Sequence, residues 1–557
     1  MRKIFKKIIS VSLFSVITIS TLFGCNSGSE EETTPGVNVA DMTPEEYYKT
    51  SEWASVEYEY AKEDHYRNYY EVFVYSFADS DGDGIGDFKG LTSKLDYIQD
   101  MGFNGIWLMP IMQSTTYHKY DVVNYMSIDS EYGTMEDFID FIDACHERNI
   151  NVIIDLVFNH TSSKHEWFTT AVDYYKSLGD DEEPDFEECP YANYYNFKKN
   201  DTVNNFNTHT KISGTKWCYE SVFWSEMPDL NLDNEAVRAE IEKVVQYWIN
   251  LGVDGFRLDA AKEYTSGSVV KNVEVLNWFE TYVQSVKPDA YIVAEVWDSY
   301  DNIKKYYESG IESIFDYAFG NAGGNLIKDI NTQKGKKLAK DIESCEAGYY
   351  EMNANMVNAP FLSNHDTGRI SGFVSRNENK IKLAGAINQI MSGCSFVYYG
   401  EEIGMFGNNS KDENKRAPMP WSNFKGGETT VGPAAMDSGI THDFGNVESQ
   451  LADKNSILWY YKNMLHIRRT YEEIAKGRTY AITDLEDSTI CVLKKEYKDE
   501  TMYILINLSE EDKTIDFSKS TYGYEEMVAS LVTNIENEVK LDSEKLSLPA
   551  YGIAFLK

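Results

Sequence analysis

The sequence predicts an α/β protein built on a (β/α)8 TIM barrel, and two observations indicate this fold. Four short apolar segments have the length of buried strands, and each carries polar residues at or near its C-terminal end: 153–160, 256–259, 291–297 and 361–366. Long, partly helical connections separate these segments, as parallel strands require. Because such barrels place their chemistry at the C-terminal ends of the strands, we expect these four ends to share one site.

The central segment is 252–260, in which Arg257 and Asp259 lie two residues apart. Residues two apart in a strand point to the same side, so a permanent cation lies beside a carboxylate. The cation keeps the carboxylate ionised, and an ionised Asp at the end of a buried strand is a candidate nucleophile. Taken alone, the pair is equally consistent with a structural ion pair.

The chain in order supplies eight expected strands and the helices between them. The strands are 69–77, 105–110, 153–157, 256–258, 291–297, 313–315, 356–362 and 395–399. The clearest helices are 91–101, 132–148, 234–251, 277–283 and 457–469. From residue 479 onward, short alternating apolar runs at 490–493, 502–506 and 552–556 predict an antiparallel β-sandwich. A chain of 557 residues is too long for one hydrophobic core, so two or three domains are expected.

These motifs resemble the four signature regions of the α-amylase superfamily, glycoside hydrolase family 13. All four stand in the expected order, and every catalytic position is filled. The resemblance implies Asp259 as nucleophile, Glu295 as general acid and base, and Asp366 as transition-state stabiliser. It also implies a supporting polar shell of Arg257, His160 and His365, with both histidines bonding the sugar ring.

The family resemblance extends to the segment 117–122, which would line the subsite of the sugar to be cleaved. Tyr120 would stack on that ring, and His118 and Asp121 would bond its hydroxyls. Lys119 stands where the commoner family form has Gly, and this form resembles neopullulanase-like and cyclomaltodextrinase-like relatives. Lys262 matches a position that contacts the sugar beyond the scissile bond.

Two further positions imply the linkage that is cleaved. Ala260, directly after the expected nucleophile, is small, and small residues there accompany α-1,4 specificity in the family. The motif 227–231 resembles the neopullulanase form of its sequence, with Met227 where oligo-1,6-glucosidases carry Gln. Together they imply the group of α-amylases intermediate between oligo-1,6-glucosidases and neopullulanases, acting on starch and maltooligosaccharides.

The resemblance also implies the domain organisation. Residues 64–157 and 232–475 would form the catalytic barrel, domain A. The long segment 158–231 has no clean periodicity and would be the inserted domain B, one wall of the cleft. Residues 476–557 would form the β-sandwich, domain C.

The loop 79–87 alternates carboxylates with glycines, which let the chain wrap tightly. Alternating oxygen ligands suit a hard cation such as Ca²⁺, and an acidic turn without metal is the alternative. The loop resembles the calcium loop of oligo-1,6-glucosidase-like members of the family. That resemblance implies a structural Ca²⁺ held by Asp79, Asp81, Asp83, Asp87 and the backbone carbonyl of Ile85.

The N-terminus has the pattern of a signal peptide over residues 1–24, with a basic start and an apolar run from 8 to 23. Residues 22–25 resemble the lipobox of bacterial lipoproteins, which implies lipidation of Cys25. A secretory signal with a chance Cys is the alternative. The polar, acidic residues 25–63 would then tether a cell-surface lipoprotein to the membrane.

Composition excludes one class of partner. The formal net charge of −38 argues against binding to nucleic acid. Seven cysteines show no zinc-ligand spacing. Cys189 and Cys218 lie in one irregular segment, so a disulfide between them and two free thiols are both compatible with the sequence.

The expected activity is retaining, endo-type hydrolysis of α-1,4-glucosidic bonds through a covalent glycosyl-enzyme, with Asp259 and Glu295 as the two carboxylates. One alternative is a neopullulanase-like, cyclomaltodextrinase-like or glucan-transferring enzyme that uses the same residues. Another is a non-catalytic glucan-binding lipoprotein on the same fold. The presence of all three carboxylates favours an enzyme.

Overall fold

The computed structural model describes residues 65–557, apart from 180, 205, 321–322, 408–410, 424–427 and 439. All of these belong to one compact unit. The predicted signal peptide, the lipidation site at Cys25 and the acidic tether lie outside the described residues. Among the helices that are described, none has the length and apolarity needed to cross a bilayer.

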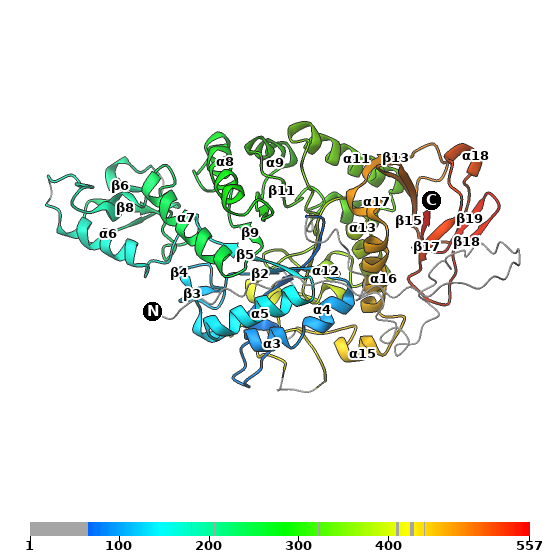
Figure 1. Ribbon diagram of the computed structural model, residues 1–557, viewed down its shortest axis with the longest axis horizontal. Coiled ribbons are helices and arrows are strands. Elements are labelled where there is room, and N and C mark those ends of the chain that lie inside the picture. Colours follow the sequence, from blue (N-terminus) through cyan, green and yellow to red (C-terminus); the bar gives the residue numbers. More distant parts are fainter. Residues whose placement is uncertain are drawn as a thin grey trace, which may run out of the picture. The chain divides into compact units, whose positions relative to one another are not determined.

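The barrel strands form one parallel sheet in the order β11-β10-β9-β5-β2-β1-β12 (Figure 1). The strands are short and buried along their length, as the apolar runs predict. Their bounds are β1 (Asn68–Val72), β2 (Gly105–Leu108), β5 (Asn151–Leu156), β9 (Gly255–Leu258), β10 (Tyr291–Ala294), β11 (Ser313–Ile314) and β12 (Ser395–Tyr398).

The expected strand at 356–362 was wrong as a regular strand, yet this segment closes the sheet. It makes two parallel bridges, Ala359 with Phe315 beyond β11 and Phe361 with Phe396 in β12. Single bridges do not make a ladder, and Pro360 lies between them without an N–H to donate. The segment therefore joins both edges of the sheet and brings His365 and Asp366 to the same end as the other strands.

Helices alternate with the strands, as barrel geometry requires. Side-chain caps begin several of them, including a capping box of Thr134 with Asp137. The predicted helix 91–101 is interrupted at residues 93–94 and forms two. The main helices are α3 (Phe88–Thr92), α4 (Leu95–Met101), α5 (Met135–Glu147), α7 (Glu235–Asn250), α8 (Val269–Val286), α9 (Tyr300–Tyr306), α10 (Asn325–Asn331), α11 (Gly335–Met352), α13 (Glu378–Ile390), α16 (Ile457–Thr470) and α17 (Glu472–Lys476).

The first strand is shorter than the apolar run predicts, because β1 ends at Val72 and a 3₁₀ turn, η3 (Val74–Ser76), follows. The backbone of the loop 79–87 packs against this turn. The N–H of Gly86 donates to the carbonyl of Tyr75 at 2.9 Å. A Cβ at position 86 would lie 1.8 Å from the carbonyl oxygen of Val74, so only Gly allows this approach.

The inserted segment between β5 and α7 contains α6 (Glu166–Ser177) and a small antiparallel sheet in the order β6-β8-β7. The sheet consists of β6 (Phe197–Lys199), β7 (His209–Lys211) and β8 (Trp217–Glu220). A bridge from His160 to Asp229 pairs the two ends of the insert, and a second bridge joins Tyr195, in its middle, to Leu230. The insert therefore leaves and re-enters the barrel at one point, beside the C-terminal end of β5.

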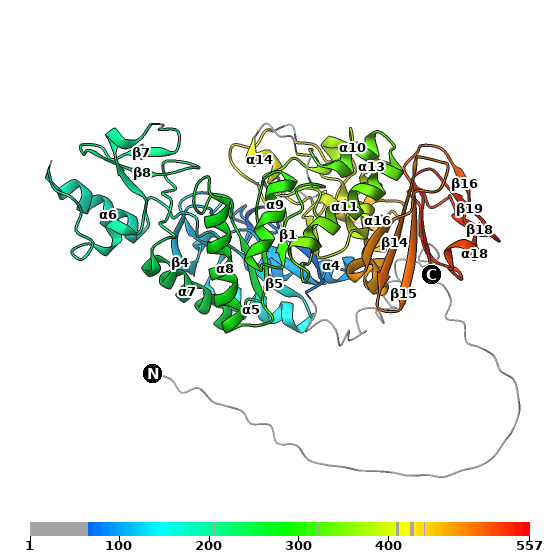
Figure 2. The ribbon, with the colours of Figure 1, turned by 90° about the horizontal axis from the view of Figure 1, so that it is seen from above.

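The C-terminal residues form two antiparallel sheets around their own core, which Figure 2 shows beside α16. The first sheet has the order β13-β14-β15-β20-β17 and the second β16-β19-β18. Ile490, Leu505 and Leu546 are among the buried residues shared between them. The bounds are β13 (Arg478–Ala481), β14 (Ile490–Tyr497), β15 (Glu500–Asn507), β16 (Lys513–Asp516), β17 (Met527–Leu531), β18 (Lys540–Asp542), β19 (Lys545–Leu548) and β20 (Ile553–Leu556).

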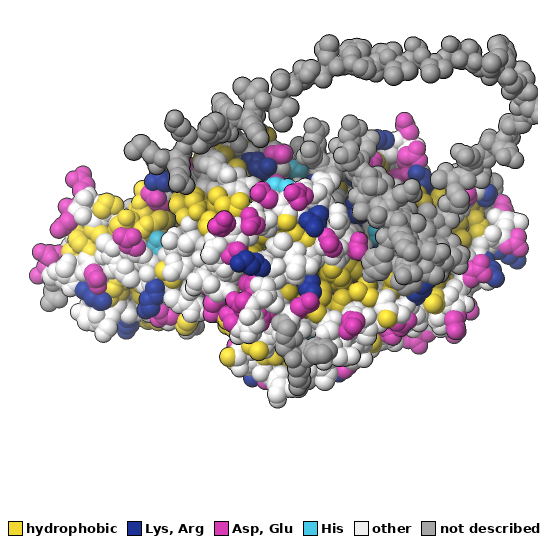
Figure 3. Space-filling view, turned by 60° about the horizontal axis from the view of Figure 1, so that its bottom comes forward, with side chains coloured by type: hydrophobic (Ala, Val, Ile, Leu, Met, Phe, Trp, Pro, Cys, Tyr) yellow, Lys and Arg dark blue, Asp and Glu magenta, His cyan; other side chains and the backbone are white. Residues whose placement is uncertain are grey.

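Cysteines and surface charge complete the description. Cys189 and Cys218 are both buried free thiols, so the disulfide that the sequence left open does not form. On the face shown in Figure 3, Asp and Glu side chains are scattered among Lys and Arg. This acidic surface is consistent with the net charge of −38.

Candidate active site

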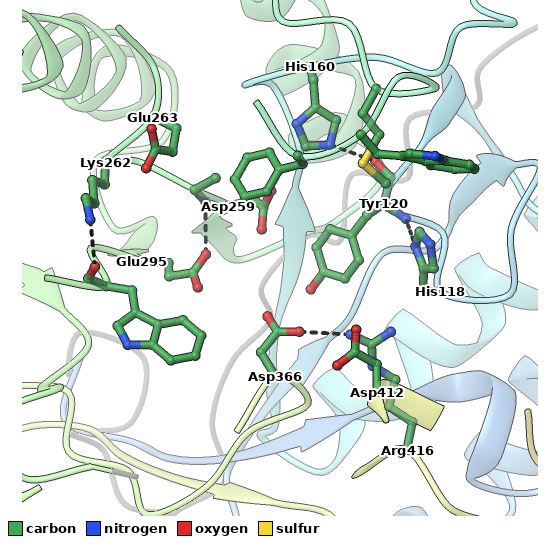
Figure 4. Close-up of a pocket in the computed structure, with 15 residues that line it drawn as sticks. His118, Tyr120, His160, Asp259, Lys262, Glu263, Glu295, Asp366, Asp412 and Arg416 are labelled. Carbon is green, nitrogen blue, oxygen red and sulfur yellow. Dashed lines mark hydrogen bonds and ion pairs between the residues drawn. The ribbon is translucent and has the colours of Figure 1, made fainter. Parts of the chain in front are cut away.

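A pocket of about 660 Å³ opens where the barrel strands end (Figure 4). Asp259 directly follows β9, and Glu295 directly follows β10. Figure 4 shows Asp259, Glu295 and Asp366 turned toward the same space. The lining residues are His118, Tyr120, His160, Phe223, Trp224, Met227, Asp259, Ala260, Lys262, Glu263, Glu295, Trp297, Asp366, Asp412 and Arg416.

Arg257 is the shared counter-ion of the site and is fully buried. Its NH1 donates to Asp259 Oδ1 at 2.7 Å and to both oxygens of Asp155 at 2.8 and 2.9 Å. Its NH2 lies 2.8 Å from Glu295 Oε2. Asp155 and Arg257 are direct partners across β5 and β9, so the strand register sets this contact. One guanidinium therefore contacts three buried carboxyl groups.

The pKa values of these carboxyls reflect that sharing. Burial raises the pKa of Asp259 and of Glu295, the Arg257 guanidinium lowers each, and the negative charge of Asp366 raises each. The charge of Asp259 also raises the pKa of Glu295. Burial likewise raises the pKa of Asp155 to about 7 against the effect of Arg257. The cluster therefore retains a proton more readily than an exposed carboxylate does.

Asp366 lies in the opposite environment. Its Oδ2 is 3.0 Å from His365 Nε2, and its Oδ1 accepts from Arg416 NH2 at 2.8 Å. Burial alone would raise the pKa of Asp366, but His365 and Arg416 outweigh it and hold that pKa below its usual value. Glu71 contacts His365 Nδ1 at 2.6 Å. Asp366 is therefore ionised at neutral pH.

The structure places most of the predicted substrate-binding residues on the pocket wall. His118, Tyr120, His160 and Lys262 line it. The two other supporting residues, Arg257 and His365, are fully buried and contact the carboxylates instead. They therefore act from behind the pocket.

The expected role of Asp121 was wrong. Its side chain is fully buried and does not line the pocket. Its oxygens accept from the hydroxyls of Ser114, Thr115 and Thr116. Because these hydroxyls satisfy the carboxylate, Asp121 closes the loop that carries His118 and Tyr120.

Sequence reasoning missed several residues that build the site. Asp155 and Glu71 lie inside the apolar strands β5 and β1, and an acid inside such a strand is a signal that could have identified them. Arg416 reaches Asp366 across 50 residues; its segment, 412–419, resembles a family element near the barrel mouth, but nothing in that segment indicates this contact. Tyr317, beyond β11, donates to Glu295 Oε1 at 3.2 Å. These contacts depend on the barrel closing.

The loop 79–87 brings three of its five predicted ligands together. Carboxylate oxygens of Asp79, Asp81 and Asp87 lie within 4.8 Å of one another. Asp83 is outside this cluster and accepts from the N–H of Ile85 at 2.7 Å. Gly82 and Gly84 have φ of 84° and 97°, which the wrapped backbone requires. An all-oxygen set of three carboxylates fits a hard cation.

The fold and the site together define a glycoside hydrolase on a (β/α)8 barrel, because paired carboxylates face a pocket with aromatic walls. Residues 71–477 match the family described as alpha amylase, catalytic domain. The chain belongs to the α-amylase superfamily, glycoside hydrolase family 13.

Three relatives place the chain within this family. It is 37% identical to Alpha-amylase 3 of Dictyoglomus thermophilum over 496 residues, covering 88% of this chain and 93% of the relative. The solved structure of Eubacterium rectale Amy13B is similar with a TM-score of 0.85 and 43% identity, over 89% of this chain and 96% of that chain. A 4-alpha-glucanotransferase of Thermotoga neapolitana is 32% identical over 363 residues, 63% of this chain and 76% of the relative. Relatives therefore differ in the reaction for which they are named.

Proposed function

We propose that the protein hydrolyses α-1,4-glucosidic bonds within starch and maltooligosaccharides, with retention of configuration. One observation carries the proposal: Asp259 and Glu295 both contact Arg257 and both line the pocket, and Asp366 faces the same space. Two carboxylates on one guanidinium favour the shorter of the two separations that glycosidases use, about 5 Å, which is the retaining geometry.

In the first step an oxygen of Asp259 bonds to the anomeric carbon while the bond from that carbon to the leaving oxygen breaks. Glu295 gives its proton to the leaving oxygen. Arg257 NH1 holds Asp259 Oδ1 at 2.7 Å, so Oδ2 is the oxygen free of this contact. The first product leaves as an alcohol, and the sugar stays bonded to Asp259.

In the second step Glu295, now ionised, takes a proton from water, and the water oxygen bonds to the anomeric carbon. The bond to Asp259 breaks, and its carboxylate is restored. Asp366 is ionised and would accept hydrogen bonds from the ring hydroxyls that strengthen in the transition state. Tyr120, His118 and His160 would hold the same ring, and Lys262 the next one.

The α-1,4 preference rests on Ala260 and on the names of the relatives. Ala260 lies in the left-handed region with φ of 49°, where a β-branched side chain is strained. A small residue is therefore favoured next to the nucleophile. The relative that covers 88% of this chain is named an α-amylase.

The same proposal includes a structural Ca²⁺ at Asp79, Asp81 and Asp87, which would neutralise these carboxylates. It also includes export and membrane anchoring through a lipid on Cys25. Fatty-acid labelling of the expressed protein tests the anchor, because Cys25→Ser should remove the label. Unchanged labelling of that variant would overturn it.

The test of activity is the product profile on soluble starch, maltoheptaose, pullulan and β-cyclodextrin. We expect starch to be cut to short oligosaccharides with the α configuration. NMR of the new anomeric proton monitors that configuration. Asp259→Asn and Glu295→Gln should both abolish cleavage. Pullulan or cyclodextrin cleaved faster than starch would move the assignment to a neopullulanase-like enzyme. A folded wild type that binds starch without cutting it would refute an enzyme.

A second candidate is glucan transfer, in which a sugar hydroxyl replaces water in the second step. Phe223, Trp224 and Trp297 line the pocket and are about half exposed, so each offers exposed ring surface on which an acceptor sugar would stack. A relative named a glucanotransferase supports this reading. Excess maltose should divert products to longer chains if transfer dominates, and should leave them unchanged if hydrolysis does.

A further inference from the structure

Tyr317 contacts Glu295 from a position that the expected catalytic residues do not include. It follows β11, beside the strand that ends at Glu295. Its ring stacks on Trp297 with centroids 5.3 Å apart and meets the edge of Phe361 at 4.9 Å. Only 7% of Tyr317 is exposed, so its neighbours fix the direction of its hydroxyl.

The two oxygens of Glu295 have different partners. Oε2 accepts from the backbone N–H of Ala260 at 3.0 Å and lies 2.8 Å from Arg257 NH2. The N–H of Ala260 and the positive charge of Arg257 both favour negative charge on Oε2, so the neutral acid carries its proton on Oε1. Tyr317 donates to Oε1 at 3.2 Å. The hydroxyl therefore acts on the oxygen that gives and takes the proton.

A donor to a carboxylate favours its ionised form over its neutral form. Burial and the charges of Asp259 and Asp366 act in the opposite direction, and Arg257 acts in the same direction. The Tyr264 ring is a further titratable group close to this cluster. Replacing Tyr317 by Phe, which has nearly the same shape, removes the hydroxyl contact with Glu295 without changing any charge.

We propose that Tyr317 is a positioning residue that lowers the proton affinity of Glu295 and so lets the same group act as acid and then as base. The inference rests on the proposed roles of Asp259 and Glu295. Trp297, whose carbonyl accepts from Lys262 Nζ at 3.3 Å, holds the Tyr317 ring in place.

The direct test is a titration of the Glu295 carboxyl in the full chain by ¹³C NMR of labelled glutamate, with its signal assigned by its loss in Glu295→Gln. Removing one donor in Tyr317→Phe should raise the midpoint by about 0.5 to 1 pH unit, the worth of one net hydrogen bond. An unchanged or lower midpoint would overturn the proposal. This readout needs no turnover, so it separates this inference from a failure of the proposed activity.

Kinetics give the second readout. The basic limb of kcat/KM should move to higher pH in Tyr317→Phe by the same amount, because the acid keeps its proton longer. Tyr349→Phe is the matched control, since that buried hydroxyl donates to Asp316 at 3.1 Å outside the pocket. It should leave the profile unchanged. An equal loss of rate at every pH in Tyr317→Phe would mark a structural role and contradict the proposal.

Discussion

Lys119 gives the sharpest test of how the pocket loop is held. It is 2% exposed, and its Nζ lies 3.2 Å from Asp129 Oδ1 and contacts Glu131. Its φ is 64°, a left-handed conformation that an L residue rarely adopts. Lys119 sits between His118 and Tyr120, which both line the pocket. The buried ion pair therefore holds a strained loop that carries two side chains of the pocket wall.

The expected loss of stability on replacing Lys119 follows from these contacts. Removing one partner of a buried pair costs about 3–5 kcal/mol. Glu131 is 41% exposed at its side chain, so its share is about 0–1 kcal/mol. Lys119→Met should thus lower stability by about 3 kcal/mol. Lys119→Ala and Lys119→Gly both lose the pair and the buried aliphatic stem, and glycine relieves about 1 kcal/mol of backbone strain, so it should be the more stable of these two variants.

Denaturant unfolding of the wild type, the three Lys119 variants and a double-mutant cycle of Lys119→Met with Asp129→Asn measures these differences in the free energy of unfolding. The coupling energy between Lys119 and Asp129 should be about 2–3 kcal/mol, so the double variant should lose that much less stability than the sum of the two single losses. The KM for maltoheptaose should rise several-fold in Lys119→Met while kcat changes less, because the loop carries none of the three carboxylates. A coupling energy below about 0.5 kcal/mol, or a glycine variant less stable than the alanine variant, would refute the reasoning.

Three further outcomes follow. Ala260→Val should lower kcat on maltoheptaose well below that of Ala260→Gly. A β-branched residue at φ 49° costs about 1–2 kcal/mol and displaces the N–H that bonds Glu295. Equal rates of the two variants would contradict this. A chelator should lower the melting temperature until Ca²⁺ is restored, and Asp81→Asn should weaken the response more than Asp83→Asn; identical responses would count against the site. Burial lowers the pKa of His365, but Asp366 and Glu71 raise it to about 9. Its charged form should therefore contribute up to about 3 kcal/mol of stability, in full below about pH 6.5 and lost as the pH rises through 9. His365→Asn should remove that pH dependence, measured by melting between pH 6 and 10, and a parallel curve for the variant would contradict it.

The sequence predicted the parts of the fold that depend on local pattern. Short apolar runs identified seven of the barrel strands, and alternating runs identified the C-terminal sheets. The strand prediction failed for two apolar segments whose burial comes from contacts outside a regular strand. In the segment 73–77, Phe77 packs against the distant residues Tyr399 and Trp421, and the segment 356–362 fills the seam of the barrel. An apolar run reports burial and leaves the partner unspecified.

The candidate site likewise contains residues that the sequence predicted and residues that it did not. Motif positions such as Asp259 and Glu295 lie where the strands predict, whereas their partners come from distant segments. Asp121 shows the limit most clearly, since its place in a motif suggested substrate contact and three neighbouring hydroxyls bury it instead. A carboxylate in a motif does not reveal what it bonds, because the loop that satisfies it is set by tertiary structure.

The charges of the completed site explain how one pocket holds both an acid and a permanent anion. Asp366 has two cations, His365 and Arg416, and is ionised. On the other side three buried carboxyls share the single charge of Arg257, so full ionisation would leave two uncompensated charges in a buried cluster. At least one proton is therefore retained among the three carboxyls at neutral pH. Of these three carboxyls, Asp259 and Glu295 line the pocket, and Arg257 donates a hydrogen bond to Asp259 but forms an ion pair with Glu295. Under the proposed function, this uneven sharing of one guanidinium assigns the proton for the leaving oxygen to Glu295.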